Sequence, residues 1–133
     1  MSPTITKEKV EKIFEYLKVL EKYQDISYED FLADTHFIIE RILELLVNTS
    51  ADLLMHKMAL VGESIPMTMR TTFLRAGELN WIPTELAENL ANAAGMRNLL
   101  VHGYEKIDLK IIHKSIKPAL KDFTDFCDSI LTN

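Results

Sequence analysis

The sequence predicts an all-α fold: an antiparallel bundle of four main helices with one short extra helix. Apolar residues recur mainly at the three- and four-residue spacing of amphipathic helices. Only four Gly and four Pro occur among 133 residues, which disfavours a loop-rich all-β fold. The composition, 47% hydrophobic and 26% charged, is that of an ordinary globular protein, and we expect residues 1–133 to form a single domain.

The first predicted helix runs from about Thr6 to Lys22. Its apolar face consists of Val10, Ile13, Phe14, Leu17 and Leu20. A second helix is capped by Ser27 and continues without Pro or Gly to about Val61, where the sequence GESIP ends it. This second helix is unusually long for a globular protein.

The second helix is also apolar on more than one side. The residues concerned are Phe37, Ile38, Ile39, Ile42, Leu43, Leu45, Leu46 and Val47. A helix with such a wide apolar surface is buried on several sides, here by the core and by a second subunit. We therefore expect a homodimer.

Three further helices complete the prediction. A short helix over 67–76 ends at Gly77, and a helix over 83–101 has small residues where close packing is needed. The last helix begins at Asp108 and is expected to kink at Pro118. Its buried face is predicted to consist of Ile112, Ile116, Ala119, Leu120, Phe123, Cys127, Ile130 and Leu131.

Composition also excludes several classes of protein. A single cysteine permits no disulfide framework, and no apolar run is long enough to cross a bilayer, so we expect a cytoplasmic protein without membrane contact. The net charge of −5 argues against a broad basic face for nucleic acid. Residues 97–121 are the exception, with six basic and two acidic side chains.

That basic segment begins at Arg97, which falls on the apolar face of its helix. Leu86, Leu90, Ala93 and Arg97 follow one another at steps of four, three and four residues. An unpaired guanidinium is costly in a dry core. We expect Arg97 to emerge into a cleft or an interface, where a carboxylate or an anionic ligand meets it.

His102 lies five residues beyond Arg97, which separates the two by about 140° on an ideal helix. They converge only if the helix unwinds near Leu100, or if a second subunit brings its own copy across. Gly103 is typical of a helix end, which would place His102 at a junction between helix and loop. Asn98, four residues before His102, would be its neighbour if the helix persists.

An arginine, an asparagine and a histidine together suit cleavage of a phosphodiester. The guanidinium binds phosphate through paired hydrogen bonds, and the imidazole transfers protons near neutral pH. RNA carries its own nucleophile in the 2′-hydroxyl, so the chemistry needs neither a metal nor a cofactor. The same residues can also be plain capping and ion-pairing groups at a helix end.

A metal site is a further alternative. The second helix carries acidic and histidine side chains at Asp34, His36, Glu40, Glu44, Asp52 and His56. Glu40 and Glu44 could share a face, but the paired Glu-x-x-His pattern of di-iron bundles is missing. Four-residue steps through Glu40, Glu44, Asn48, Asp52 and His56 could equally line a groove or face water.

The stretch RNLLVHGY resembles the signature of the HEPN superfamily, and more closely that of its HepT-like branch, R-x4-H-x-Y. In this sequence the pattern corresponds to Arg97, Asn98, His102 and Tyr104. The helix order and chain length resemble the family along nearly the whole sequence. The resemblance implies a dimeric, metal-independent ribonuclease toxin whose two motifs face each other across the dimer cleft, with Arg97 and His102 catalytic and Asn98 and Tyr104 in support.

The resemblance also implies a partner, a minimal nucleotidyltransferase antitoxin that transfers AMP to the motif tyrosine, here Tyr104. The low overall basicity favours a small single-stranded or loop target such as part of a tRNA. Candidate RNA contacts are Lys106, Lys110, Lys114, Arg70 and Arg75, whereas His113 is expected to be solvated or to cap its helix. The alternative function is a non-catalytic helical subunit that binds nucleotide or a nucleotidyltransferase partner.

Overall fold

The computed structural model describes residues 3–101 and 108–132, and every regular element in these ranges is a helix. In chain order these are α1 (Pro3–Glu21), the single turn α2 (Tyr28–Asp30), the π-helical turn η1 (Phe31–Thr35), α3 (His36–Leu60), α4 (Met69–Glu78), α5 (Thr84–Val101) and α6 (Leu109–Thr132). The predicted all-α bundle of four main helices and a short extra one is confirmed. No helix in these ranges is long and apolar enough to span a bilayer.

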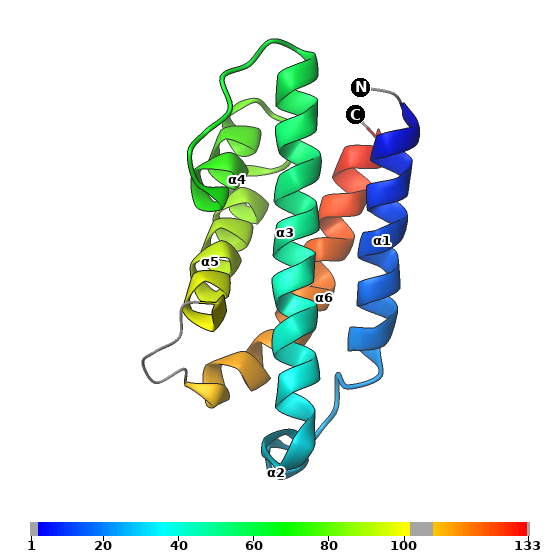
Figure 1. Ribbon diagram of the computed structural model, residues 1–133, viewed down its shortest axis with the longest axis vertical. Helices are drawn as coiled ribbons and strands as arrows, with labels where there is room; N and C mark the ends of the chain where they lie inside the picture. Colours follow the sequence, from blue (N-terminus) through cyan, green and yellow to red (C-terminus); the bar gives the residue numbers. More distant parts are fainter. Residues whose placement is uncertain (1–2, 102–107, 133) are drawn as a thin grey trace.

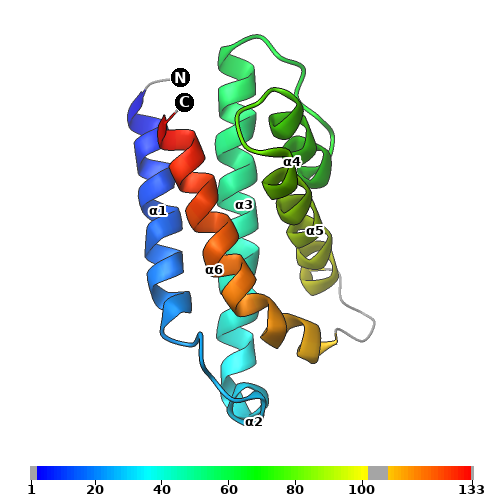
Figure 2. The ribbon, with the colours of Figure 1, turned by 180° about the vertical axis from the view of Figure 1, so that it is seen from behind.

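The longest helix, α3, is the centre of the bundle (Figure 1). It packs against α1 and α6 on one side and against α4 and α5 on the other, as the reverse view in Figure 2 also shows. The start of α1 and the end of α6 lie side by side at one end of the bundle, and the end of α5 lies toward the other. The last turns of α5, which carry Arg97 and Asn98 of the predicted motif, are therefore remote from the start of α1 and the end of α6.

The predicted long second helix is helical throughout but not uniform. Ser27 caps it as expected, since its hydroxyl oxygen accepts a hydrogen bond from the Asp30 amide at 3.1 Å. One π-helical turn at η1 then separates α2 from α3. Gly62, with φ at 77°, adopts the left-handed conformation that ends α3, as the GESIP segment predicts.

The prediction that Gly77 ends the short helix is wrong. The α4 helix continues to Glu78, and the left-handed residue that follows is Asn80, with φ at 61°. Gly77 is buried, and a Cβ atom at that position would lie 2.7 Å from the Cβ of Ala87 on α5. This glycine therefore allows α4 and α5 to approach closely, and the helix end depends on asparagine.

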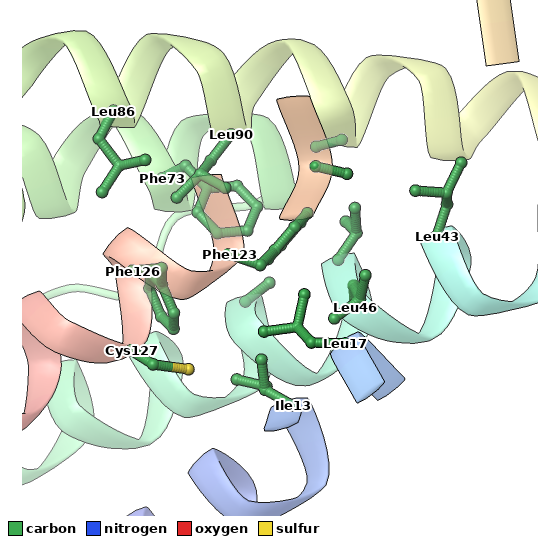
Figure 3. Packing of buried hydrophobic residues seen from close by; sticks show 14 of the residues in the cluster. Ile13, Leu17, Leu43, Leu46, Phe73, Leu86, Leu90, Phe123, Phe126 and Cys127 are labelled. Carbon is green, nitrogen blue, oxygen red and sulfur yellow. The ribbon is translucent and has the colours of Figure 1, made fainter. Parts of the chain in front are cut away.

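The core is continuous from α1 to α6 (Figure 3). Phe73 of α4 and Phe126 of α6 meet edge to face with their ring centres 6.4 Å apart. The prediction that Phe14 and Leu131 are buried is wrong, because Phe14 is 41% exposed and Leu131 is 59% exposed. Phe126, which is missing from the predicted buried face of the last helix, is buried. Phe14 and Leu131 lie at the edges of the apolar faces of their helices, where packing against other helices decides burial. Burial raises the pKa of the Cys127 thiol to about 12.

The α6 helix contains Pro118 and changes direction along its length (Figures 1 and 2). Its first turns run toward the C-terminal end of α5, and the rest of the helix lies alongside α1 and α3. The bend agrees with the kink expected at this proline. It brings the start of α6 near the end of α5, where Arg97 and Asn98 lie.

Candidate active site

The predicted arginine lies at the end of a buried row on α5. Leu86 and Leu90 are buried, and Ala93 and Arg97 are partly buried. The row follows directly from the three- and four-residue spacing, so this prediction is confirmed. The α5 helix continues to Val101, which places Arg97 and Asn98 in its last turns.

Arg97 is held by its neighbour. Its Nη1 donates a hydrogen bond to Asn98 Oδ1 at 3.2 Å, while Nε is buried and has no hydrogen-bond partner among the described residues. An unpaired buried donor costs roughly 1–3 kcal/mol. No carboxylate in the described ranges pairs with this guanidinium. Arg97 therefore has hydrogen-bonding capacity for an anion.

The rest of the motif lies outside the described residues. This applies to His102 and Tyr104, and the predicted RNA contact Lys106 also lies outside them, so the predicted roles of all three stay predictions. Asp108 precedes α6, and its Oδ1 accepts a hydrogen bond from the Lys110 amide at 3.0 Å as that helix begins. The structure thus describes both helices next to His102 and Tyr104 in the sequence, α5 before them and α6 after them.

The predicted basic contacts divide into two kinds. Lys110 and Lys114 are exposed on the first turns of α6. Arg70 of α4 donates from Nη1 to Asn92 Oδ1 of α5 at 3.3 Å, five residues before Arg97. Arg75, by contrast, is paired with Glu63 at 3.2 Å and with Glu78 at 3.6 Å. Those carboxylates engage the Arg75 guanidinium, so Arg75 is less available to RNA than Arg70.

A groove of about 250 Å³ lies between α3, α5 and α6, beside the row that leads to Arg97. Its apolar walls include Leu43, Val47, Ala93, Met96 and Phe123. Its polar lining consists of Asn89, Asn92, Ser115 and Asp122. The helical pattern of the sequence alone does not predict this groove. The available signal was the spacing of Asn89, Asn92 and Met96, which places all three on one side of α5.

The carboxyl group in the groove is perturbed. Burial raises the pKa of Asp122 above its usual value, and a hydrogen bond from Asn89 Nδ2 to Oδ1, at 3.4 Å, opposes that rise. Partial desolvation is thus the larger influence on Asp122. The Asp122 carboxyl group is therefore partly shielded from water in the wall of the groove.

The expectation for His113 is wrong. Its Nε2 lies 2.7 Å from the carbonyl oxygen of Ile26, and its ring packs against Tyr28 and Phe31 with centroid distances of 5.5 and 5.2 Å. His113 is partly buried and joins α6 to the connection between α1 and α2. A contact between residues 87 positions apart in the chain is invisible to helical periodicity.

Several of the acidic and histidine side chains of the predicted second helix form ion pairs. His36 Nδ1 lies 2.6 Å from Glu40, Arg41 pairs with Glu44 at 3.1 Å, and Lys9 of α1 pairs with Asp52. Within 3–101 and 108–132, no three His, Cys, Asp or Glu side chains are close enough to hold a metal ion together. The row on α3 therefore serves ion pairs in this part of the chain.

Comparison with known proteins supports the resemblance to the HepT-like family that the sequence motif and the helix order indicate. The model of the family described as ribonuclease HepT-like matches residues 13–130. The "tRNA nuclease HepT" of Aphanizomenon flos-aquae is 30% identical over 125 residues, covering 92% of this chain and 85% of that protein. The "mRNA nuclease HepT" of Shewanella oneidensis is 35% identical over 66 residues, covering 50% of each chain.

Solved structures agree with this relationship. A tri-AMPylated HEPN toxin of Shewanella oneidensis, solved in complex with an MNT antitoxin, superimposes with a TM-score of 0.88. The match covers 100% of both chains at 26% sequence identity. Sequence and fold are thus shared along almost the whole chain, and the protein belongs to the HepT-like ribonuclease family.

Proposed function

We propose that this protein is a metal-independent endoribonuclease that acts as the toxin of a toxin–antitoxin pair. Its family membership supports the nuclease activity, and two relatives carry the names tRNA nuclease and mRNA nuclease. A structurally similar HEPN toxin was solved with an MNT antitoxin, which supports a nucleotidyltransferase as the partner. The proposed substrate is RNA, with a tRNA as the first candidate, and the proposed place of action is the cytoplasm.

The observation that supports the proposal most directly is the burial and hydrogen bonding of the Arg97 guanidinium. Its guanidinium is partly buried, is oriented by Asn98, and keeps a buried Nε without a partner among the described residues. A purely structural arginine in such a position would be expected to meet a carboxylate. A phosphate oxygen at this position would accept from Nε and stabilise the group electrostatically.

The proposed reaction is attack of the RNA 2′-hydroxyl on the adjacent phosphorus. Arg97 would hold the phosphate and stabilise the charge that develops on its oxygens, and Asn98 would orient the guanidinium. His102 would accept the 2′-hydroxyl proton or protonate the leaving 5′-oxygen. The P–O5′ bond breaks as the new P–O2′ bond forms, leaving a cyclic phosphate and a 5′-hydroxyl.

A homodimer with facing motifs is part of the proposal. Phe37 is 70% exposed and Ile38 is 46% exposed on α3, beside core residues of the same helix. Apolar side chains of this size on one exposed face are typical of a contact with another subunit. Tyr104 is the proposed site of AMP transfer, which would place a bulky anion beside His102 and repel RNA phosphate.

The experiment compares unmodified protein with its His102→Ala variant on a mixed tRNA pool in EDTA, with intact mass establishing that Tyr104 carries no AMP. We expect fragments from the parent and none from the variant, while both keep the same oligomeric mass. His56→Ala is the matched control, since His56 is exposed on α3 and its nearest carboxylate is Asp52 at 3.9 Å. That control should cleave normally.

Two results would contradict the proposal. Cleavage that survives in His102→Ala would remove the histidine from the reaction. No cleavage by any of the unmodified proteins would favour a non-catalytic subunit that binds nucleotide or a nucleotidyltransferase.

A further inference from the structure

We propose that the groove between α3, α5 and α6 binds one base of the RNA, an adenine by preference, next to the phosphate held by Arg97. This inference rests on the proposed ribonuclease function and adds a determinant of substrate choice. It concerns residues that lie outside the R-x4-H-x-Y motif.

The walls of the groove suit the flat faces of a base. Leu43 and Val47 come from α3, Ala93 and Met96 from α5, and Phe123 from α6. Bases in single-stranded RNA bind proteins by placing their faces against aromatic and apolar side chains. A volume of about 250 Å³ leaves room for a single base but not for a folded protein element.

The polar lining suits the edge of adenine. Asn92 Oδ1 accepts from Arg70 at 3.3 Å, and its amide nitrogen makes no hydrogen bond to another described residue. Asn89 donates to Asp122, which leaves its carbonyl oxygen as an acceptor. Asn92 keeps its amide hydrogens as donors, and its Oδ1 has a second lone pair besides the one that accepts from Arg70. A donor and an acceptor side by side match the N6 and N7 edge of adenine.

The register of α5 connects the groove to the proposed phosphate site. Ala93 lines the groove, and Arg97 lies four residues further, about 6 Å along the helix axis and on the same side. Met96, also in the wall, directly precedes Arg97. A base in the groove and a phosphate at Arg97 can therefore belong to one nucleotide or to two adjacent ones.

Charge at the rim fits a polyanion. Arg70 is held at the groove through Asn92, and Arg97 directly follows Met96, the last residue of α5 in the groove lining. Two cations close to an apolar groove favour a ligand with an uncharged base and a charged backbone. The apolar walls around the polar lining keep water from a bound base, which would strengthen the hydrogen bonds to its edge.

The test measures binding, so that it does not depend on cleavage. Unmodified His102→Ala protein is titrated with fluorescein-labelled single-stranded RNA, either oligo(A) or oligo(U) of equal length, and the ratio of the two Kd values is recorded. We expect oligo(A) to bind more tightly. In the same background, Asn92→Leu should move the ratio toward one, with roughly a tenfold loss for oligo(A).

Two further variants control the experiment. Ala93→Met narrows the groove without changing charge and should act like Asn92→Leu, which keeps the inference testable if one variant is unstable. Glu88→Gln changes an exposed residue of α5 outside the groove lining and should leave the ratio unchanged. Circular dichroism establishes that each variant is folded.

An unchanged ratio in Asn92→Leu and Ala93→Met, or a parent that does not discriminate between the RNAs, would overturn the inference. So would a loss of oligomeric mass in both groove variants by analytical ultracentrifugation, since that would assign the groove to a second copy of the chain. Failure of the nuclease proposal looks different: tRNA stays uncut by the parent in EDTA although base preference persists.

Discussion

Arg97 and Asn98 are consecutive residues near the end of α5, and the first donates to the second, from Nη1 to Oδ1 at 3.2 Å. Consecutive side chains point about 100° apart on a helix, so only the long arginine can fold back to make this contact. The hydrogen bond restricts the guanidinium without neutralising it. An arginine that is restricted but not neutralised is suited to an anionic ligand, which is the role proposed for Arg97.

This relationship predicts that Arg97 is dispensable for folding. Replacing it by Met removes a buried donor without a partner, so the free energy of unfolding should stay the same or rise by about 1 kcal/mol. Cleavage of RNA should fall at least about a hundredfold, as when an electrostatic stabiliser of the transition state is lost. Urea denaturation and single-turnover kinetics measure the two effects. A variant that unfolds easily would instead make Arg97 a structural residue.

The two helical glycines of α4 and α5 provide a matched pair. Gly77→Ala should lower the free energy of unfolding by roughly 1–3 kcal/mol, because the added Cβ would lie 2.7 Å from Ala87. A Cβ atom added by Gly95→Ala would have no atom within 4 Å, so this substitution should raise the free energy of unfolding by about 0.4–1 kcal/mol. Thermal and urea unfolding measure both. Equal effects of the two substitutions would show that close packing of α4 on α5 does not depend on Gly77.

A pH dependence follows from Asp122. Its pKa is raised in the folded protein by burial, so the protonated acid is favoured on folding and stability falls as the pH rises through the interval between the unfolded and folded values. Asp122→Asn removes this cost, and should be more stable than the parent at pH 7. The difference should shrink as the pH falls from the raised pKa of the folded protein toward 3.8, the usual pKa of this side chain. Melting temperatures at pH 3 and pH 7 test this, and a difference independent of pH would contradict it.

His113 should matter for the position of α6. His113→Phe keeps a ring beside Tyr28 and Phe31 but leaves the Ile26 carbonyl without its partner, at a cost of about 1–3 kcal/mol. His56→Ala, at an exposed position, should change stability by less than about 0.5 kcal/mol. Urea unfolding compares them. Equal, small changes would mean that the contact with Ile26 contributes nothing to the anchoring of α6.

Local pattern was enough for much of the fold and for part of the site. The spacing of apolar residues predicts the main helices, Ser27 predicts a cap, and the steps from Leu86 to Arg97 place the arginine at the end of a buried row. These features depend on neighbours within four residues, which is the range over which helical periodicity carries information. The roles of His102 and Tyr104 stay predictions, since both residues lie outside the described ranges.

Patterns within single helices thus predict the helical class, the order of the helices and the position of Arg97 at the end of a buried row of α5. They do not predict that Gly77 is a packing contact, that His113 contacts Ile26, or that Asn89, Asn92 and Asp122 share a groove. Each of these three features joins residues on different elements. Their distances depend on how whole helices pack, and a periodic pattern along one helix does not contain that information.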